Sequence, residues 1–244
     1  MKARTILITG ASSGIGAAVA QRFLDKGWHV GLMARRARQL NALAEGRKNA
    51  YVLPADVTDP AAVDAAFDAF TDRVGHLDVL FNNAGMFGPS GSIDEVPLED
   101  WWQVMQVNLN GMFICARAAF GRMRAQHPQG GRIINNGSIS AHSPRAGSVC
   151  YTTTKHAITG LTKALSLDGR AYGIVCSQID IGNARTEMVD DLNDRLRKAN
   201  KPVQPTMNVA QVADSVQLMA EMPPEANVQF MTVMASTMPY IGRG

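Results

Sequence analysis

The sequence predicts an α/β protein, a single domain in which a doubly wound parallel sheet of about seven strands is flanked by helices. Short apolar runs rich in β-branched residues alternate with longer segments of helical periodicity. The first apolar run leads directly into a cluster of glycines. The 244 residues, 46% hydrophobic and 18% charged, suit one large core without repeats or internal boundaries, so residues 1–244 are expected to form one domain.

Composition argues against several classes of function. The net charge of +3 is too small to predict nucleic-acid binding. Three cysteines, Cys115, Cys150 and Cys176, lack CxxC or metal-ligand spacing, which predicts no metal site and a reducing, cytoplasmic location. The chain starts without a signal peptide, and its apolar runs fall short of the ~20 residues of a membrane span. Neither nucleic acid nor a membrane is expected as a partner.

The first strand is predicted at residues 5–9, which are all apolar or β-branched. Three glycines follow, and residues 15–26 have helical periodicity. Glycine lets the backbone turn tightly and approach a pyrophosphate, whose charge is met by the amides at the helix start. The turn predicts a dinucleotide site, and a glycine-rich turn without a ligand is the alternative. The contacts expected here are Gly10, Ser12, Ser13, Gly14, Ile15 and Gly16.

The second strand is predicted at residues 28–34 and leads into Arg35 and Arg36. In a NAD site the position about 20 residues beyond the glycines is acidic, because a carboxylate accepts hydrogen bonds from the ribose 2′-hydroxyl. Guanidinium groups pair instead with a 2′-phosphate. The two arginines therefore predict NADP(H) over NAD(H), unless they only begin the solvated helix expected at residues 39–45.

The next two strands end in polar residues. The third, at residues 51–54, is followed by Asp56-Val57. Asp56 can accept a hydrogen bond from the adenine amine or cap the helix expected at residues 60–74, whose proline suits a first turn. The fourth strand, at residues 78–81, runs into Asn82-Asn83-Ala84-Gly85. Small and amide residues at this end of a strand lie where open α/β sheets bind ligands.

The longest helical pattern covers residues 101–126. Asn108 interrupts its apolar face, and a buried amide needs hydrogen bonds, so Asn108 is either a structural link or part of the site. The fifth strand is predicted at residues 132–139 and carries Ser138 near its end. Ser138 is therefore expected at the same sheet edge as the glycine turn.

The helix predicted at residues 148–172 carries Tyr151 and Lys155. Their spacing of four residues places them one turn apart on the same face. A nearby ammonium stabilises a phenolate and lowers the pKa of the phenol, so Tyr151 is a candidate general acid or base.

The rest of the chain combines a polar segment with three regular elements. Residues 187–205 are polar and turn-prone, and the segment around 183–206 is expected to form a lid over the pocket. The remaining elements are a strand at residues 173–180, a helix at 208–222, a strand at 230–235 and a tail at 238–244.

Taken together, these motifs resemble those of the short-chain dehydrogenases/reductases. Residues 9–16 match the family's TGxxxGxG turn, Asp56 its adenine-side aspartate and residues 82–85 its NNAG element. Asn108, Ser138, Tyr151 and Lys155 match its catalytic asparagine, serine, tyrosine and lysine. The resemblance covers residues 3–235. It implies a single-domain Rossmann fold and hydride transfer between NADP(H) and a small-molecule carbonyl or secondary alcohol.

The resemblance also implies roles for single residues. Ser138 would orient the substrate oxygen and Tyr151 would exchange its proton. Lys155 would lower the pKa of Tyr151 and bind the nicotinamide ribose, and Asn108 would hold a water that links Lys155 to solvent. A homo-oligomer, tetramer or dimer, is expected on the two long helices. The cofactor contacts beyond the glycine turn are Arg35, Arg36, Asp56, Val57, Asn82, Ala84, Gly85, Tyr151, Lys155, Ile181 and Thr186.

Two departures from the family pattern affect the substrate rather than hydride transfer. Ile181-Gly182 stands where the family often has Pro-Gly, and residues 235–237 replace a common Asp-Gly-Gly. Two other functions are compatible with the motifs: a non-catalytic NADP-binding sensor, and a nucleotide-dependent dehydratase or epimerase. Arg145 either binds a substrate carboxylate or is solvated. The substrate pocket is expected among Met86, Phe87, Ser140, His142, Pro144, Arg145 and the 183–206 segment.

Overall fold

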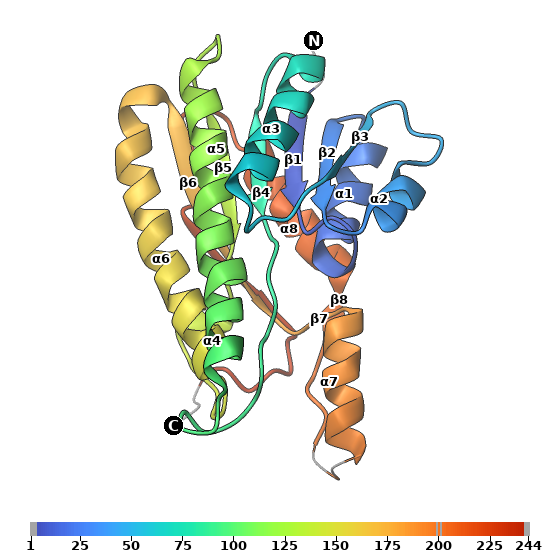
Figure 1. The fold of residues 1–244 in the computed structure, drawn as a ribbon, viewed down its shortest axis with the longest axis vertical. Coiled ribbons are helices and arrows are strands. Elements are labelled where there is room, and N and C mark those ends of the chain that lie inside the picture. The colour runs from blue at the N-terminus through green and yellow to red at the C-terminus, as the bar shows by residue number, and fades with distance from the viewer. Residues whose placement is uncertain (1–3, 199, 201, 242–244) are drawn as a thin grey trace.

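In the computed structural model, which describes residues 4–198, 200 and 202–241, seven parallel strands form one sheet (Figure 1). The chain winds outward from the sheet centre in both directions, which confirms the predicted doubly wound fold. The strands, in spatial order, are β3 (Ala50–Pro54), β2 (His29–Ala34), β1 (Thr5–Thr9), β4 (Val79–Asn82), β5 (Gly131–Asn136), β6 (Ile174–Gly182) and β9 (Phe230–Met234).

Helices cover both faces of the sheet (Figure 1). One face packs against α1 (Gly14–Asp25), α2 (Ala37–Ala44) and α8 (Val209–Glu221), and the core there contains buried Phe23 and Leu32. The opposite face packs against α3 (Pro60–Val74), α5 (Gly111–Ala125) and α6 (Val149–Gly169). The sheet is therefore buried on both sides, as its β-branched runs predict.

Two predicted elements differ from the structure around Asn108 and Ser138. The expected helix at residues 101–126 is α4 (Leu98–Met105) and α5 joined by a π-helical turn, Gln106–Asn110, which contains Asn108. π-helical turns are rare and often occur at functional sites. β5 ends at Asn136, so Ser138 follows the strand and begins a 3₁₀ helix, Ile139–Ala141.

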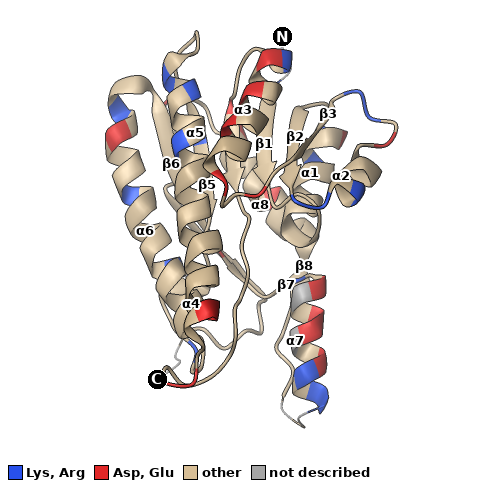
Figure 2. Cartoon of the chain, in the orientation of Figure 1, with Lys and Arg blue, Asp and Glu red and all other residues tan. Residues whose placement is uncertain are grey.

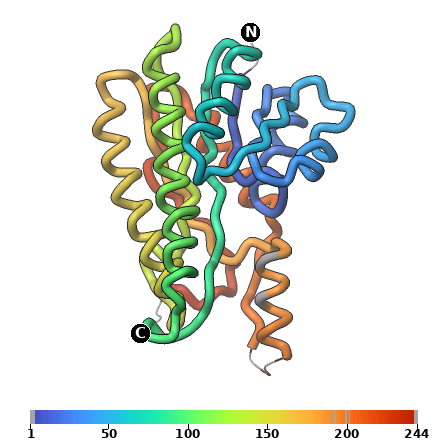
Figure 3. The backbone as a smooth tube through the Cα atoms, in the orientation of Figure 1, coloured from blue at the N-terminus to red at the C-terminus, as the bar shows by residue number. Residues whose placement is uncertain are grey.

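The prediction of turns at residues 187–205 is wrong for most of that segment, because α7 (Glu187–Lys198) is a regular helix. Acidic residues occupy its first turn and basic residues its last, which suits the helix dipole (Figure 2). Short strands, β7 (Ala184–Arg185) and β8 (Met207–Asn208), pair at its base and form a second sheet. The tube in Figure 3 shows α7 projecting from the rest of the domain.

The C-terminal segment packs beside the turn that carries Ser138. Ala235 and Met238 are buried against Ile139. Residues 242–244 of the predicted tail lie outside the described residues. Among the helices of the described ranges, none combines the length and apolarity needed to cross a membrane.

Candidate active site

The glycine turn leaves backbone amides open at the start of α1. Gly10 and Gly14 have φ angles of +67° and +53°, left-handed values that favour glycine. A Cβ at Gly16 would lie 2.3 Å from the carbonyl oxygen of Gly10, so a larger residue does not fit. Ser13 caps α1 without a side-chain hydrogen bond to the helix. These amides are available to an anion such as a pyrophosphate.

Arg36 is held by the serines of the glycine turn. Its guanidinium donates to Oγ of Ser12 at 2.9 Å and to Oγ of Ser13 at 2.6 Å. The exposed Arg35 lies 3.8 Å from a carboxylate oxygen of Asp56. Arg36 is thus hydrogen-bonded beside the helix start, while Arg35 lies beside Asp56 at the same cavity.

Asp56 does not cap the following helix, which corrects one of its two predicted roles. Asp59 is the N-cap of α3, and its Oδ1 accepts from the amides of Ala61 and Ala62. Asp56 instead accepts from the amide and the hydroxyl of Thr58 through Oδ1. Its Oδ2 faces Arg35, at the edge of the cavity described below.

Hydrogen bonds join the NNAG element to the ends of two strands. Oγ1 of Thr9 accepts from the amides of Asn83 (2.8 Å) and Ala84 (2.9 Å). Asn136 donates to the side chain of Asn83 at 2.8 Å. The predicted contact Asn82 lies elsewhere, because its buried side chain donates to the carbonyl of Met112 on α5. Asn83, which belongs to the predicted NNAG element but was not among the predicted cofactor contacts, lines the cavity.

Asn108 links the NNAG segment to α6. Its Oδ1 accepts from the amide of Met86 and its Nδ2 donates to the Met86 carbonyl, both at 2.8 Å. Nδ2 also lies 3.3 Å from Oγ1 of Thr154. The side chain is fully buried, and these bonds make it a link between the two segments. Its role in the site stays a prediction.

Ser138, Tyr151 and Lys155 meet at the carboxyl ends of β5 and β6. Ser138 begins its 3₁₀ turn with Oγ accepting from the amide of Ser140. Tyr151 lies in the first turn of α6, with its ring edge against Phe87 and its hydroxyl bonded to Ser138. Lys155 Nζ donates to the carbonyl of Asn136 at 2.7 Å and lies 5.4 Å from the centre of the Tyr151 ring.

Burial controls the protonation of this group. Loss of water raises the pKa of Tyr151, and the hydrogen bond from Ser138 and the positive charge of Arg145 offset part of this rise. Burial lowers the pKa of Lys155 from 10.5 to about 8, against the opposing effect of Asp180. The pKa of Tyr151 is thus raised overall in this structure, because desolvation outweighs the groups that lower it.

The lowered pKa of Lys155 should make the free energy of unfolding depend on pH, and this dependence should be lost when Lys155 is replaced with methionine. Between about pH 8 and pH 10.5 the unfolded chain binds a proton that the folded chain releases, so the free energy of unfolding of the wild type rises with pH. Relative to the K155M variant, the wild type should gain roughly 2 kcal/mol between about pH 7.5 and 9.5. Urea unfolding of both proteins across this range measures the difference. A constant difference would contradict it.

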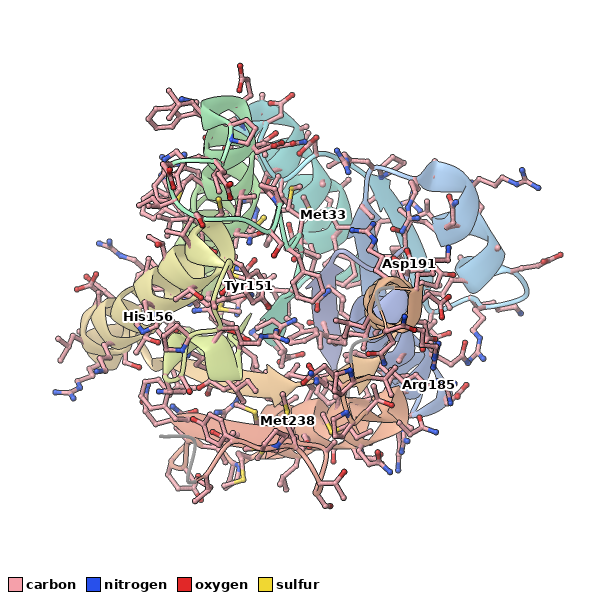
Figure 4. The ribbon with its side chains drawn as sticks, turned by 90° about the horizontal axis from the view of Figure 1, so that it is seen from below. Met33, Tyr151, His156, Arg185, Asp191 and Met238 are labelled. Carbon is pink, nitrogen blue, oxygen red and sulfur yellow. The ribbon has the colours of Figure 1, made fainter. Side chains whose placement is uncertain are left out.

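A cavity of about 650 Å³ connects the glycine turn with Tyr151. Its size is typical of small-molecule sites. In Figure 4, Tyr151 of α6 and Asp191 of α7 lie on opposite sides of the opening. The predicted site residues that line it are Gly10, Ser12, Ser13, Gly14, Ile15, Gly16, Arg35, Arg36, Asp56, Val57, Ala84, Gly85, Ser138, Tyr151, Lys155, Ile181 and Thr186.

Comparison with known proteins assigns the family. Residues 4–197 match the family described as short chain dehydrogenase. The chain belongs to this family. It is thus an oxidoreductase of the short-chain dehydrogenase type, and its fold and motifs agree with the resemblance drawn from the sequence.

Several curated short-chain dehydrogenases are similar to the chain. A 3beta-hydroxysteroid dehydrogenase of Mediterraneibacter gnavus is 36% identical over 72% of the chain, and the match spans 64% of that relative's length. A 2-(R)-hydroxypropyl-CoM dehydrogenase of Xanthobacter autotrophicus is 36% identical over 89% of the chain and 91% of its own length. A serine 3-dehydrogenase of Rhizobium radiobacter is 30% identical over 98% and 96%.

Solved structures show the same fold. A closed form of serine dehydrogenase complexed with NADP+ superposes with a TM-score of 0.89 and 25% identity, covering 98% of each chain. A 3-ketoacyl-(acyl-carrier-protein) reductase from Brucella melitensis complexed with NADH has a TM-score of 0.85 and 25% identity, covering 94% of this chain and 96% of its own. The two complexes contain different nicotinamide cofactors.

The structure also identifies site residues that the sequence analysis missed. Asn136 supplies the carbonyl that binds Lys155, a backbone role that its side-chain type does not reveal. Asp180 is buried beneath Ser138 and pairs with His142. A charged residue between Ile179 and Ile181 in a buried strand was an available signal for Asp180, because such residues are rarely buried unless they are paired.

Proposed function

We propose that the protein transfers a hydride between NADP(H) and a carbonyl or secondary alcohol, with Tyr151 as general acid or base. The observation that carries the proposal is the cavity that joins open amides at the glycine turn to the Tyr151 hydroxyl. Ser138 and Lys155 lie at the same end of this cavity. An anionic dinucleotide and a proton donor are thus accommodated in one continuous space.

The residues present fit a nicotinamide dinucleotide. The glycine turn would hold its pyrophosphate, Asp56 and Val57 its adenine side, and Lys155 its nicotinamide ribose. The cofactor, when bound, supplies the hydride. Ile181 pairs with β9 as part of β6 and lines the cavity. A proline at this position would lack the backbone N–H that a strand donates to its neighbour, so the isoleucine lets β6 continue here.

The protein side of the reaction is a proton transfer in an oriented complex. The Ser138 hydroxyl would donate a hydrogen bond to the substrate oxygen and hold the carbonyl in place. Tyr151 would donate its proton to the developing alkoxide during reduction and accept it during oxidation. Its raised pKa keeps the phenol protonated near neutral pH, which favours the acid role. Asn108, buried beside Thr154, would hold the water that links Lys155 to solvent.

The preference for NADP(H) rests on Arg36. A guanidinium fixed beside the start of α1 is suited to a 2′-phosphate, and Asp56 is turned toward Thr58 and Arg35. The serine dehydrogenase of similar fold was solved with NADP+. The similar reductase was solved with NADH, so cofactor competition is the direct test.

A substrate screen tests the reaction class. NADPH absorbance should fall in stoichiometric amount with at least one compound of a carbonyl panel, and rise from NADP with the corresponding alcohol. The panel should include serine, a 3-hydroxysteroid and a hydroxyalkyl thioether, which the names of the relatives suggest. Tight NADP(H) binding without turnover would favour the sensor function. Product formation without a change in absorbance would favour the dehydratase or epimerase.

We also propose a homo-oligomer that is built on the long helices. Large apolar side chains on α4, α5 and α6 are exposed, among them Trp102 (63%), Phe113 (53%) and Leu167 (59%). Residues of α5 and α6 line one surface hollow, and apolar side chains exposed on one face of a protein often form interfaces. For the cytoplasmic location, the supporting observation is that all three cysteines are free and buried.

Charge on this helical surface should dissociate the assembly. The double variant Phe113→Glu/Leu167→Glu is expected to elute as a monomer, because each carboxylate would lose water on association. Light scattering on the wild type should give the mass of a dimer or tetramer. The matched variant Leu218→Glu, exposed on α8 away from these helices, should keep the wild-type mass. A monomeric wild type would contradict the proposal.

A further inference from the structure

Asp180 is a buried carboxylate with both oxygens occupied. It lies in β6 between two isoleucines and is 1% exposed. Oδ1 accepts from the amide of Ser138 at 2.9 Å and from Nε2 of Gln178 at 2.8 Å. Oδ2 accepts from Nε2 of His142 at 2.8 Å. An ionised carboxylate at this depth is tolerated only when it is paired and hydrogen-bonded, which these partners provide.

The two oxygens hold the two ends of one turn. Ser138 caps the 3₁₀ helix, and His142 ends it with its amide bonded to the carbonyl of Ile139. The Ser138 amide and the His142 ring both donate to Asp180. The turn that carries the Ser138 hydroxyl is thus hydrogen-bonded to β6 at both ends.

Packing around Asp180 leaves little freedom for it to move. A Cβ at Gly137 would lie 2.1 Å from Oδ1 of Asp180, so the backbone passes directly over the carboxylate. Gln178 is itself held by α6, because Nε2 donates to Thr159 and Oε1 accepts from Thr162. The carboxylate is therefore fixed in place by β6 and α6, while His142 lies on the exposed side with 42% of its side chain accessible.

We propose that Asp180 and His142 are positioning residues that fix the Ser138 hydroxyl for the reduction or oxidation of the substrate. This inference rests on the proposed function. Neither side chain lines the cavity, so both act through Ser138 rather than on the substrate. The negative charge of Asp180 has a second effect: it raises the pKa of Lys155 and so offsets part of the lowering caused by burial.

Variants of His142 test the hydrogen bond separately from the fold. His142→Leu removes the donor to Asp180 and should lower kcat about tenfold, with KM changed less and NADPH affinity unchanged. His142→Gln places an amide Nε2–H at the same reach and should restore kcat to within about threefold of the wild type. His156→Leu is the matched control, because His156 lies on the outer side of α6 and should leave kcat unchanged (Figure 4).

Two further measurements decide the proposal. Hydrogen exchange of residues 137–143 should be faster in His142→Leu than in the wild type and close to normal in His142→Gln. This readout requires no substrate. Equal kcat in the wild type and His142→Leu, or equal losses in His142→Leu and His142→Gln, would overturn the positioning role. Such results would leave the proposed function intact as long as turnover by the wild type is lost in Tyr151→Phe.

Discussion

Replacing Tyr151 with phenylalanine is expected to lower kcat by about a thousandfold, within the range that a general acid or base contributes. The substitution deletes only the hydroxyl that donates the proton. The ring contact with Phe87 does not involve this hydroxyl, so the wall of the cavity should be retained. Affinity for NADPH, measured by fluorescence titration, should stay within about threefold of the wild type, which corresponds to less than about 0.7 kcal/mol.

The control for Tyr151→Phe is the same substitution at a tyrosine outside the cavity, which tests whether loss of any tyrosine hydroxyl lowers turnover. Tyr172 follows α6 and packs its ring against Phe120, outside the cavity, so Tyr172→Phe should turn over at the wild-type rate. Near-normal turnover in Tyr151→Phe would remove the assignment of Tyr151 as acid or base. Loss of both turnover and NADPH binding would indicate a damaged site instead.

Replacing Arg35 and Arg36 together with alanine should weaken NADPH binding about 30- to 100-fold and NADH binding less than threefold. The expected change equals about 2 to 3 kcal/mol, the value of charge-assisted hydrogen bonds to a phosphate. Most of the loss should already appear in Arg36→Ala, because Arg36 is fixed by Ser12 and Ser13 while Arg35 is largely exposed.

The control for this pair is another exposed arginine nearby. Arg38 lies in α2 and does not line the cavity, so Arg38→Ala should bind both cofactors as the wild type does. Raising the salt concentration should weaken NADPH binding more than NADH binding in the wild type, and this difference should disappear in the double variant. Equal losses for the two cofactors would show that the arginines do not read the 2′-phosphate.

The sheet and much of the site could be predicted because each depends on local signals. Residues 5–9 and 78–81 are short apolar runs, and buried parallel strands require such runs. The glycine turn could be found because only glycine adopts its positive φ angles without strain. Tyr151 and Lys155 could be placed on one helix face because residues four apart in a helix lie one turn apart.

The parts that were missed depend on contacts between distant segments or on weak patterns. α7 contains few apolar residues, so its charge distribution, acidic first and basic last, was the better signal. The bond between Asp180 and His142 joins residues 38 positions apart, and sequence spacing does not reveal it. The raised pKa of Tyr151 follows from burial, which becomes known only when the cavity wall is assembled.

The packing of Ala235 and Met238 against Ile139 has a practical consequence for activity. Changes in this segment should therefore shift the turn of Ser138, so Met238→Ala is expected to reduce turnover. β1 begins instead at the end of the sheet opposite the cavity (Figure 1). Substitutions around Met238 therefore offer a way to adjust activity from outside the cavity, whereas substitutions at the start of β1 should leave the turn of Ser138 in place.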